Sequence, residues 1–169
     1  MFGNEARAAI IARTAAFIGL ITIGGWVSIP FIPIPLTLQT LFILLAGGLM
    51  RRNAIVPAAA YVLLGAMNLP VFHNGTAGIG VLLGPTGGYL IGFVPAALIA
   101  GLGYESANRV VQGLGLIAAT VAIYTCGIAW YTFSTGIPLV PAIVVGVLPF
   151  IPGDLLKAFV AHGIAGRFR

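Results

Sequence analysis

Charged side chains are scarce in this chain of 169 residues, and acidic ones are the rarest. Only 7% of the residues are charged and three are acidic, whereas 60% are hydrophobic. So little polar surface cannot cover a soluble domain, and lipid must therefore solvate most of the chain. The composition excludes a soluble globular protein and predicts an integral membrane protein.

Groups for catalysis or metal binding are nearly absent as well. The single Cys126 excludes an intramolecular disulfide and a cysteine-based metal cluster. His73 has no second histidine or nearby carboxylate to complete a metal site. The longest basic run is Arg51-Arg52, too short for a nucleic-acid surface, and no nucleophile or phosphate-loop motif occurs. We therefore expect no metal, cofactor, nucleic-acid partner or enzyme activity, and any ATP-driven step must come from a partner.

Long apolar runs are what the chain does contain. A spanning helix needs about 20 mostly apolar residues, which leaves room for about six spans and no sizeable soluble domain. We expect residues 1–169 to form a single transmembrane domain, an all-α bundle of six helices. The expected runs cover residues 8–29, 36–50, 54–67, 88–102, 110–133 and 140–164.

Two segments between these runs carry breaking residues. Prolines at positions 30, 33 and 35 predict a short, stiff loop between the first two helices. The Gly-rich segment 68–88 predicts a structured lid or re-entrant loop between helices three and four. The second and third runs are short for spans, which fits loop backbone that enters the membrane inside the bundle.

Basic residues alternate with the predicted spans. If both termini are cytoplasmic, the loops and ends on that side hold six arginines: Arg7, Arg51, Arg52, Arg109, Arg167 and Arg169. The opposite loops hold no Lys or Arg, which agrees with the positive-inside rule. Residues 8–29 lack a clear cleavage site, so we interpret them as a retained helix rather than a signal peptide.

Small residues recur every four positions in two of the runs. Such spacing lets helix backbones approach closely in lipid. In the fourth run these residues are Gly88, Gly92, Ala96 and Ala100, and packing within the bundle is the simpler explanation. In the first run they are Ala8, Ala12 and Ala16, where a docking face for another membrane subunit competes with ordinary packing.

The last run contains the only aspartate and the only lysine of the chain, Asp154 and Lys157. Ionisable residues inside a span are costly and mark functional sites that face the bundle interior. At a spacing of i and i+3 the two share one helix face. Pro149 and Pro152 predict a broken helix that restarts near Pro152, with Asp154 in its first turn. The alternative is a buried ion pair that only fixes helix register.

Few other polar groups are available to the same cavity. They are Thr37, Gln39, Asn68, His73, Asn74, Thr76, Thr86 and Tyr89. Apolar Trp26, Phe31, Phe72 and Phe93 complete the expected lining of an outward-facing pocket that is mostly apolar with a few directional hydrogen bonds.

Four blocks of the sequence, in order, resemble one family. They are residues 32–40 (IPIPLTLQT), 65–72 (GAMNLPVF), 83–93 (LGPTGGYLIGF) and 149–157 (PFIPGDLLK). The chain is similar to the BioY family, the biotin-specific substrate-binding component of energy-coupling factor transporters. The resemblance covers nearly the whole chain and departs mainly at residues 73–76.

The resemblance implies a six-helix protein of a bacterial-type cytoplasmic membrane that captures biotin from outside. It implies partners: a transmembrane coupling subunit, docked on Ala8, Ala12 and Ala16, and two ATPase subunits. Its substrate-binding residues would be Asp154, Lys157, Asn74, Thr37, Gln39 and Tyr89. The alternatives are a structural or assembly subunit and a substrate-binding component for another vitamin. A membrane enzyme would need a nucleophile or metal set that the sequence lacks.

Overall fold

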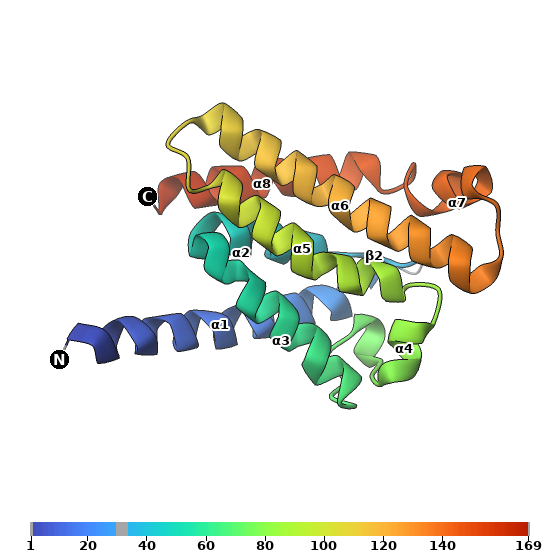
Figure 1. The fold of residues 1–169 in the computed structure, drawn as a ribbon, viewed down its shortest axis with the longest axis horizontal. Helices are drawn as coiled ribbons and strands as arrows, with labels where there is room; N and C mark the ends of the chain where they lie inside the picture. The colour runs from blue at the N-terminus through green and yellow to red at the C-terminus, as the bar shows by residue number, and fades with distance from the viewer. Residues whose placement is uncertain (1, 30–33, 169) are drawn as a thin grey trace.

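The computed structural model describes residues 2–29 and 34–168 and is mostly helical (Figure 1). The helices are α1 (Phe2–Trp26), α2 (Gln39–Met50), α3 (Ile55–Ala66), α4 (Ile79–Leu83), α5 (Gly87–Gly103), α6 (Arg109–Thr135), α7 (Leu139–Gly146) and α8 (Ile151–Arg167). Two 3-10 turns, η1 (Arg51–Ala54) and η2 (His73–Gly75), and two short strands, β1 (Ser28–Ile29) and β2 (Leu36–Thr37), complete the fold.

Each of the six predicted runs contains a helix, but the described residues do not give six full-length spans. Three helical stretches are long and apolar enough to cross a membrane: Arg7–Trp26, Gln39–Ala66 and Arg109–Thr135. The bent pair α7 and α8 gives a fourth if the two helices are counted as one span, and α5 is a shorter apolar helix. The number of long stretches is smaller than six partly because α2 and α3 join through η1 into one stretch. Each of the two helices has only 12 residues, which is about 18 Å at the usual rise.

The junction of the first two runs differs from the prediction. α1 ends at Trp26 rather than Ile29, and β1 pairs antiparallel with β2, with Ser28 opposite Thr37. Ile29 precedes Pro30, and a residue before a proline favours extended backbone, whose polar groups here pair with β2 rather than within a helix. Residues 30–33 of the predicted proline loop, Phe31 among them, lie outside the described residues.

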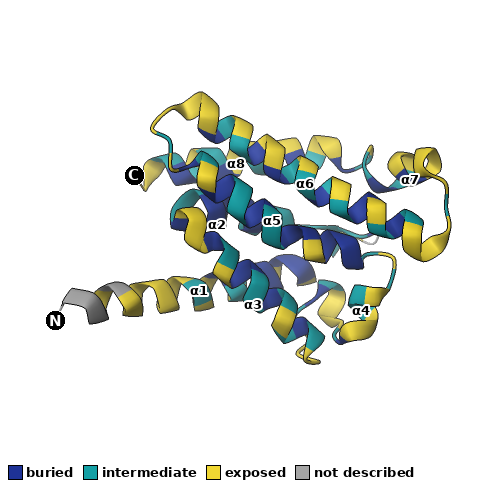
Figure 2. Ribbon diagram, viewed as in Figure 1, coloured by how far each residue is buried: buried dark blue, intermediate teal, exposed yellow. Residues whose placement is uncertain are grey.

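The bundle exposes apolar side chains and buries small ones. Figure 2 shows exposed residues along the outer faces of α6 and α8 and along the first half of α1. Leu114 and Val121 of α6 and Phe159 of α8 are among the exposed large hydrophobics. A contiguous apolar exterior is what lipid, not water, solvates.

The predicted small-residue stripe of α5 packs against α6 at Gly88 and Gly92 and against Gly47 of α2 at Ala100. A Cβ on Gly88 would come within 2.3 Å of the Trp130 Cβ and 2.4 Å of the Cys126 carbonyl oxygen. Ala96 and Ala100, further along the stripe, are fully buried. Packing inside the bundle is therefore confirmed for this stripe.

Gly88→Ala is accordingly expected to lower the free energy of unfolding by about 1–3 kcal/mol, because the added methyl group forces α5 away from α6. Thermal unfolding in detergent measures the effect. Gly113→Ala in α6 is the matched control, since nothing lies within 4 Å of its added Cβ. An equal Tm for the parent and Gly88→Ala would contradict this close packing.

The stripe of Ala8, Ala12 and Ala16 is exposed. No other element of the described bundle covers this part of α1, which extends beyond the remaining helices at the N-terminal end (Figures 1 and 2). The stripe does not serve packing within the bundle. Its role as a docking face stays a prediction.

Both chain ends lie at the same end of the molecule, on the left in Figure 1. The turn between α5 and α6 lies there too, as does η1 with its two arginines. At this end Arg52 Nε and Nη2 donate to the Glu105 carboxylate at 2.5 and 2.8 Å. The predicted clustering of basic residues at one end is therefore present in the fold.

Candidate ligand-binding site

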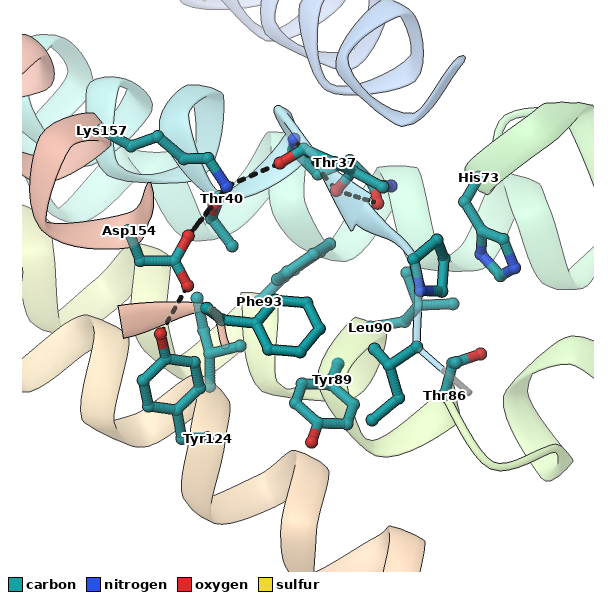
Figure 3. A pocket seen from close by; sticks show the side chains of 15 residues that line it. Thr37, Thr40, His73, Thr86, Tyr89, Leu90, Phe93, Tyr124, Asp154 and Lys157 are labelled. Carbon is teal, nitrogen blue, oxygen red and sulfur yellow. Dashed lines mark hydrogen bonds and ion pairs between the residues drawn. The ribbon is translucent and has the colours of Figure 1, made fainter. Parts of the chain in front are cut away.

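A pocket lies where the β1–β2 hairpin, α2, the connector before α5, and helices α5, α6 and α8 meet (Figure 3). It is lined by Ile34, Pro35, Thr37, Gln39, Thr40, His73, Thr86, Tyr89, Leu90, Phe93, Ile123, Tyr124, Phe150, Asp154 and Lys157. Segments from both ends of the sequence therefore build one site, mostly apolar with a few polar groups.

The ionisable pair enters the pocket from a broken helix, as predicted. α7 ends at Gly146, and α8 begins at Ile151 with its axis turned by 53°. Pro152 occupies the start of α8, where a missing N–H costs nothing. Asp154 consequently lies in the first helical turn, where the positive end of the helix dipole stabilises a carboxylate.

Asp154 and Lys157 form a buried ion pair. Lys157 Nζ lies 2.8 Å from Asp154 Oδ1, and the two side chains are only 12% and 4% exposed, respectively. Lys157 Nζ also donates to the Thr37 carbonyl oxygen at 2.7 Å and to Thr40 Oγ1 at 3.1 Å. The pair is therefore neutral as a unit and ties α8 to β2 and α2.

Two residues at this pair were not identified from the sequence. Thr40 Oγ1 donates to Asp154 Oδ1 at 2.9 Å, and Tyr124 OH donates to Asp154 Oδ2 at 2.6 Å. Thr40 belongs to the recognised block 32–40, but Tyr124 lies in an apolar span. No sequence signal distinguishes Tyr124 from Tyr131 of the same helix, since only the relative rotation of α6 and α8 brings one of them to Asp154.

A second hydrogen-bonded group joins the pocket to the connector. Thr37 Oγ1 donates to Gln39 Oε1 at 3.0 Å, and Gln39 Nε2 donates to Tyr61 OH. Tyr61 OH in turn donates to the Val71 carbonyl oxygen at 3.0 Å. The predicted residues Thr37 and Gln39 thus lie in the pocket wall, with Gln39 itself buried.

Tyr89 also lines the pocket, but its hydroxyl points to the Gly146 carbonyl oxygen at 2.9 Å and so supports the α7–α8 break. Asn74 is placed differently from the prediction. It is exposed, has a positive φ of 54° and accepts a hydrogen bond from Ser28 Oγ. Its neighbour His73 lines the pocket instead, so Asn74 is not brought together with the other predicted site residues.

The predicted apolar lining is only partly present. Phe93 lies in the pocket, whereas Phe72 is fully buried against the Gly65 backbone and the Tyr61 ring. Trp26 is exposed, and its Nε1 donates to the Pro70 carbonyl oxygen at 3.2 Å. These two aromatic residues hold the connector in place rather than line the pocket.

The pocket has two polar ends with an apolar middle. In Figure 3, Asp154, Lys157 and Tyr124 lie on one side and His73 and Thr86 on the other. The rings of Tyr89 and Phe93 lie between the two ends. Burial lowers the pKa of His73, so its imidazole is neutral near pH 7 and can donate one hydrogen bond. Among the described residues, no three metal-ligating side chains gather.

Such an arrangement defines a class of protein. A helical bundle with an apolar exterior and a pocket whose polar groups converge on a buried ion pair is a membrane-embedded protein that binds a small molecule. The profile of the BioY family matches residues 3–169, and the chain belongs to this family. It is therefore a multi-pass membrane protein of a transporter family.

Relatives and a solved structure agree over nearly the full length. The biotin transporter BioY of Thermotoga maritima is 40% identical over 161 residues, which cover 94% of this chain and 95% of that protein. The probable biotin transporter BioY of Pyrococcus horikoshii is 37% identical over 164 residues, covering 96% and 98%. The crystal structure of the S-component for biotin from an ECF-type ABC transporter has a TM-score of 0.89 at 29% identity, covering 98% of this chain and 93% of that chain.

Proposed function

We propose that this protein captures biotin for uptake, as the substrate-binding component of an ECF-type transporter. The observation that carries the proposal is the buried Asp154–Lys157 pair in a mostly apolar pocket, in a chain of the BioY family. A buried ion pair rarely recovers its desolvation cost by itself, whereas a polar ligand that hydrogen-bonds to it can offset that cost.

The two-ended pocket suits the chemistry of biotin. Its ureido ring has two N–H donors and a carbonyl acceptor, its thioether ring is apolar, and its tail ends in a carboxylate. The neutral Asp154–Lys157 unit favours the uncharged ureido group, with Asp154 accepting an N–H and Lys157 donating to the carbonyl oxygen. The carboxylate then lies toward His73 and Thr86, and the apolar part against Phe93.

Ligand capture has to exchange internal hydrogen bonds. An ammonium has three N–H donors, and Lys157 Nζ already has three acceptors: Asp154 Oδ1, the Thr37 carbonyl and Thr40 Oγ1. A ligand oxygen that binds Lys157 must replace one of them. Replacement of the Thr37 carbonyl would free β2 and so connect occupancy of the pocket to the position of the hairpin.

We further propose the membrane arrangement and the partners. In this proposal six helices, α1, α2, α3, α5, α6 and the α7–α8 pair, cross or enter the bilayer of a bacterial-type cytoplasmic membrane. The end that carries both termini and the arginines faces the cytoplasm. The exposed stripe of Ala8, Ala12 and Ala16 docks a transmembrane coupling subunit. Two ATPase subunits supply the energy, and the chain itself needs no metal or cofactor.

Equilibrium binding of biotin to the purified protein in detergent tests the proposal. Saturable binding by the chain alone, with riboflavin and thiamine unable to compete, is the expected result. Competition by either of these vitamins would assign the pocket to another substrate. If the protein is folded, as shown by cooperative unfolding, but does not bind biotin, the Asp154–Lys157 pair has only a structural role.

A further inference from the structure

Tyr124 occupies a position that the binding chemistry alone does not explain. Its hydroxyl donates to Oδ2 of Asp154 at 2.6 Å, while Lys157 and Thr40 both donate to Oδ1. Both carboxylate oxygens are thus held by the protein, from α6 on one side and from α2 and α8 on the other. Three donors on a group with four lone-pair positions leave one free.

Tyr124 also stands at a wall of the pocket. A second hollow, between α6 and α8, is lined mostly by apolar side chains. It is lined by Ile117, Thr120, Val121, Tyr124, Val147, Ile151, Asp154, Leu155 and Ala158. Only Tyr124 and Asp154 line both hollows. The hydrogen bond between them therefore lies in the wall that separates the ligand pocket from the apolar groove, which in a membrane faces lipid.

A carboxylate in that wall needs a partner on its second oxygen. Without the donor from α6, Oδ2 has no side-chain hydrogen bond to the protein, and only the two bonds at Oδ1 oppose rotation about the terminal torsion, which is broad and has no strong preference of its own. Rotation would turn Oδ2 and its lone pairs away from a ligand and toward a mostly apolar groove, where the Thr120 hydroxyl already donates to the Leu116 carbonyl oxygen at 3.0 Å.

We infer that Tyr124 is a positioning residue for ligand capture: it fixes the Asp154 carboxylate so that a single acceptor site faces the pocket and selects a ligand with a ring N–H donor. The inference rests on the proposed function and deepens it. Tyr124 acts through Asp154 and sets both the affinity for the ureido group and its orientation.

Tyr124→Phe tests this role because it removes the hydroxyl and keeps the ring that forms the wall. Biotin affinity is expected to fall about tenfold or more, the scale of a hydrogen bond to a charged group. Tyr131→Phe is the matched control: Tyr131 is a buried tyrosine of the same helix that does not line the pocket. Its affinity is expected to stay within twofold of the parent.

A spectroscopic measurement separates positioning from a general loss of packing. Because Asp154 is the only aspartate, labelling with [4-13C]aspartate gives one side-chain carboxylate signal. In the ligand-free protein this signal is expected to move in Tyr124→Phe and to stay unchanged in Tyr131→Phe. Biotin is expected to shift it in the parent, and less in Tyr124→Phe.

Different results would overturn the proposed function and the role of Tyr124. A parent that does not bind biotin overturns the proposed function, and the inference with it. A parent that binds biotin, with Tyr124→Phe unchanged in affinity or in the 13C signal, overturns the role of Tyr124 alone. Equal losses in Tyr124→Phe and Tyr131→Phe, with equal falls in Tm, also overturn it, because they indicate packing rather than positioning.

Discussion

Lys157→Met is expected to weaken biotin binding by at least about 100-fold and to lower the stability of the protein by about 3–5 kcal/mol, the usual cost of removing one partner of a buried ion pair. The methionine fills a similar volume but leaves the Asp154 carboxylate buried without its counterion. It also removes the donors to the Thr37 carbonyl and Thr40 Oγ1. Biotin titration and thermal unfolding in detergent measure the two effects.

A control for Lys157→Met is available on the same helix. Arg167→Met also removes a cation from α8, but Arg167 is exposed in the last turn. Its binding and Tm are expected to match the parent, since exposed charges contribute little. Retention of biotin affinity by folded Lys157→Met would show that the lysine only fixes packing.

Asp154→Asn is expected to weaken biotin binding by roughly 10- to 150-fold, the range for one charge-assisted hydrogen bond. The asparagine keeps the size and one oxygen, so Thr40 and Lys157 retain an acceptor. Its amide nitrogen, however, presents hydrogens where the carboxylate accepts from Tyr124, and the ligand N–H loses a charged acceptor. The fall in Tm is expected to be smaller than for Lys157→Met, which lacks any polar replacement.

The charge swap, with Lys at position 154 and Asp at position 157, separates a binding role from a structural one. A pair that only fixes helix register would regain its stability on swapping. A binding pair would not regain biotin affinity, because Tyr124 and Thr40 donate toward position 154 and the Thr37 carbonyl accepts from position 157. Recovery of biotin affinity in the swapped protein would contradict the geometry proposed for the ligand.

The membrane character and the central pair were predictable because each follows from a local cost. Asp154 and Lys157 stand out in an apolar run, and the prolines near them predict the break between α7 and α8. The α5 stripe was predictable for a similar reason, since small residues at four-residue spacing indicate close helix packing. These features depend on the free energy of placing one residue type in lipid or in a helix.

The rest depends on tertiary geometry. The β1–β2 pairing joins residues on both sides of a proline segment. In the sequence, the residues on either side look like the end of one apolar helix and the start of the next. Asn74 was expected in the pocket because it is polar and lies in the connector, but it has a positive φ and its side chain accepts a hydrogen bond from Ser28 instead. Tyr124 could not be selected among the tyrosines without the rotation of α6 about its axis.

The hydrogen bond from Lys157 to the Thr37 carbonyl joins residues 120 positions apart. At translation rates of about 5–20 residues per second, Lys157 is made roughly 6–24 seconds after Thr37. The hairpin and α2 are therefore synthesised before the residue that fixes them exists. A nascent or truncated chain without α8 already carries the small-residue face of α1 but has no ligand site, so only finished chains can deliver biotin to a transporter.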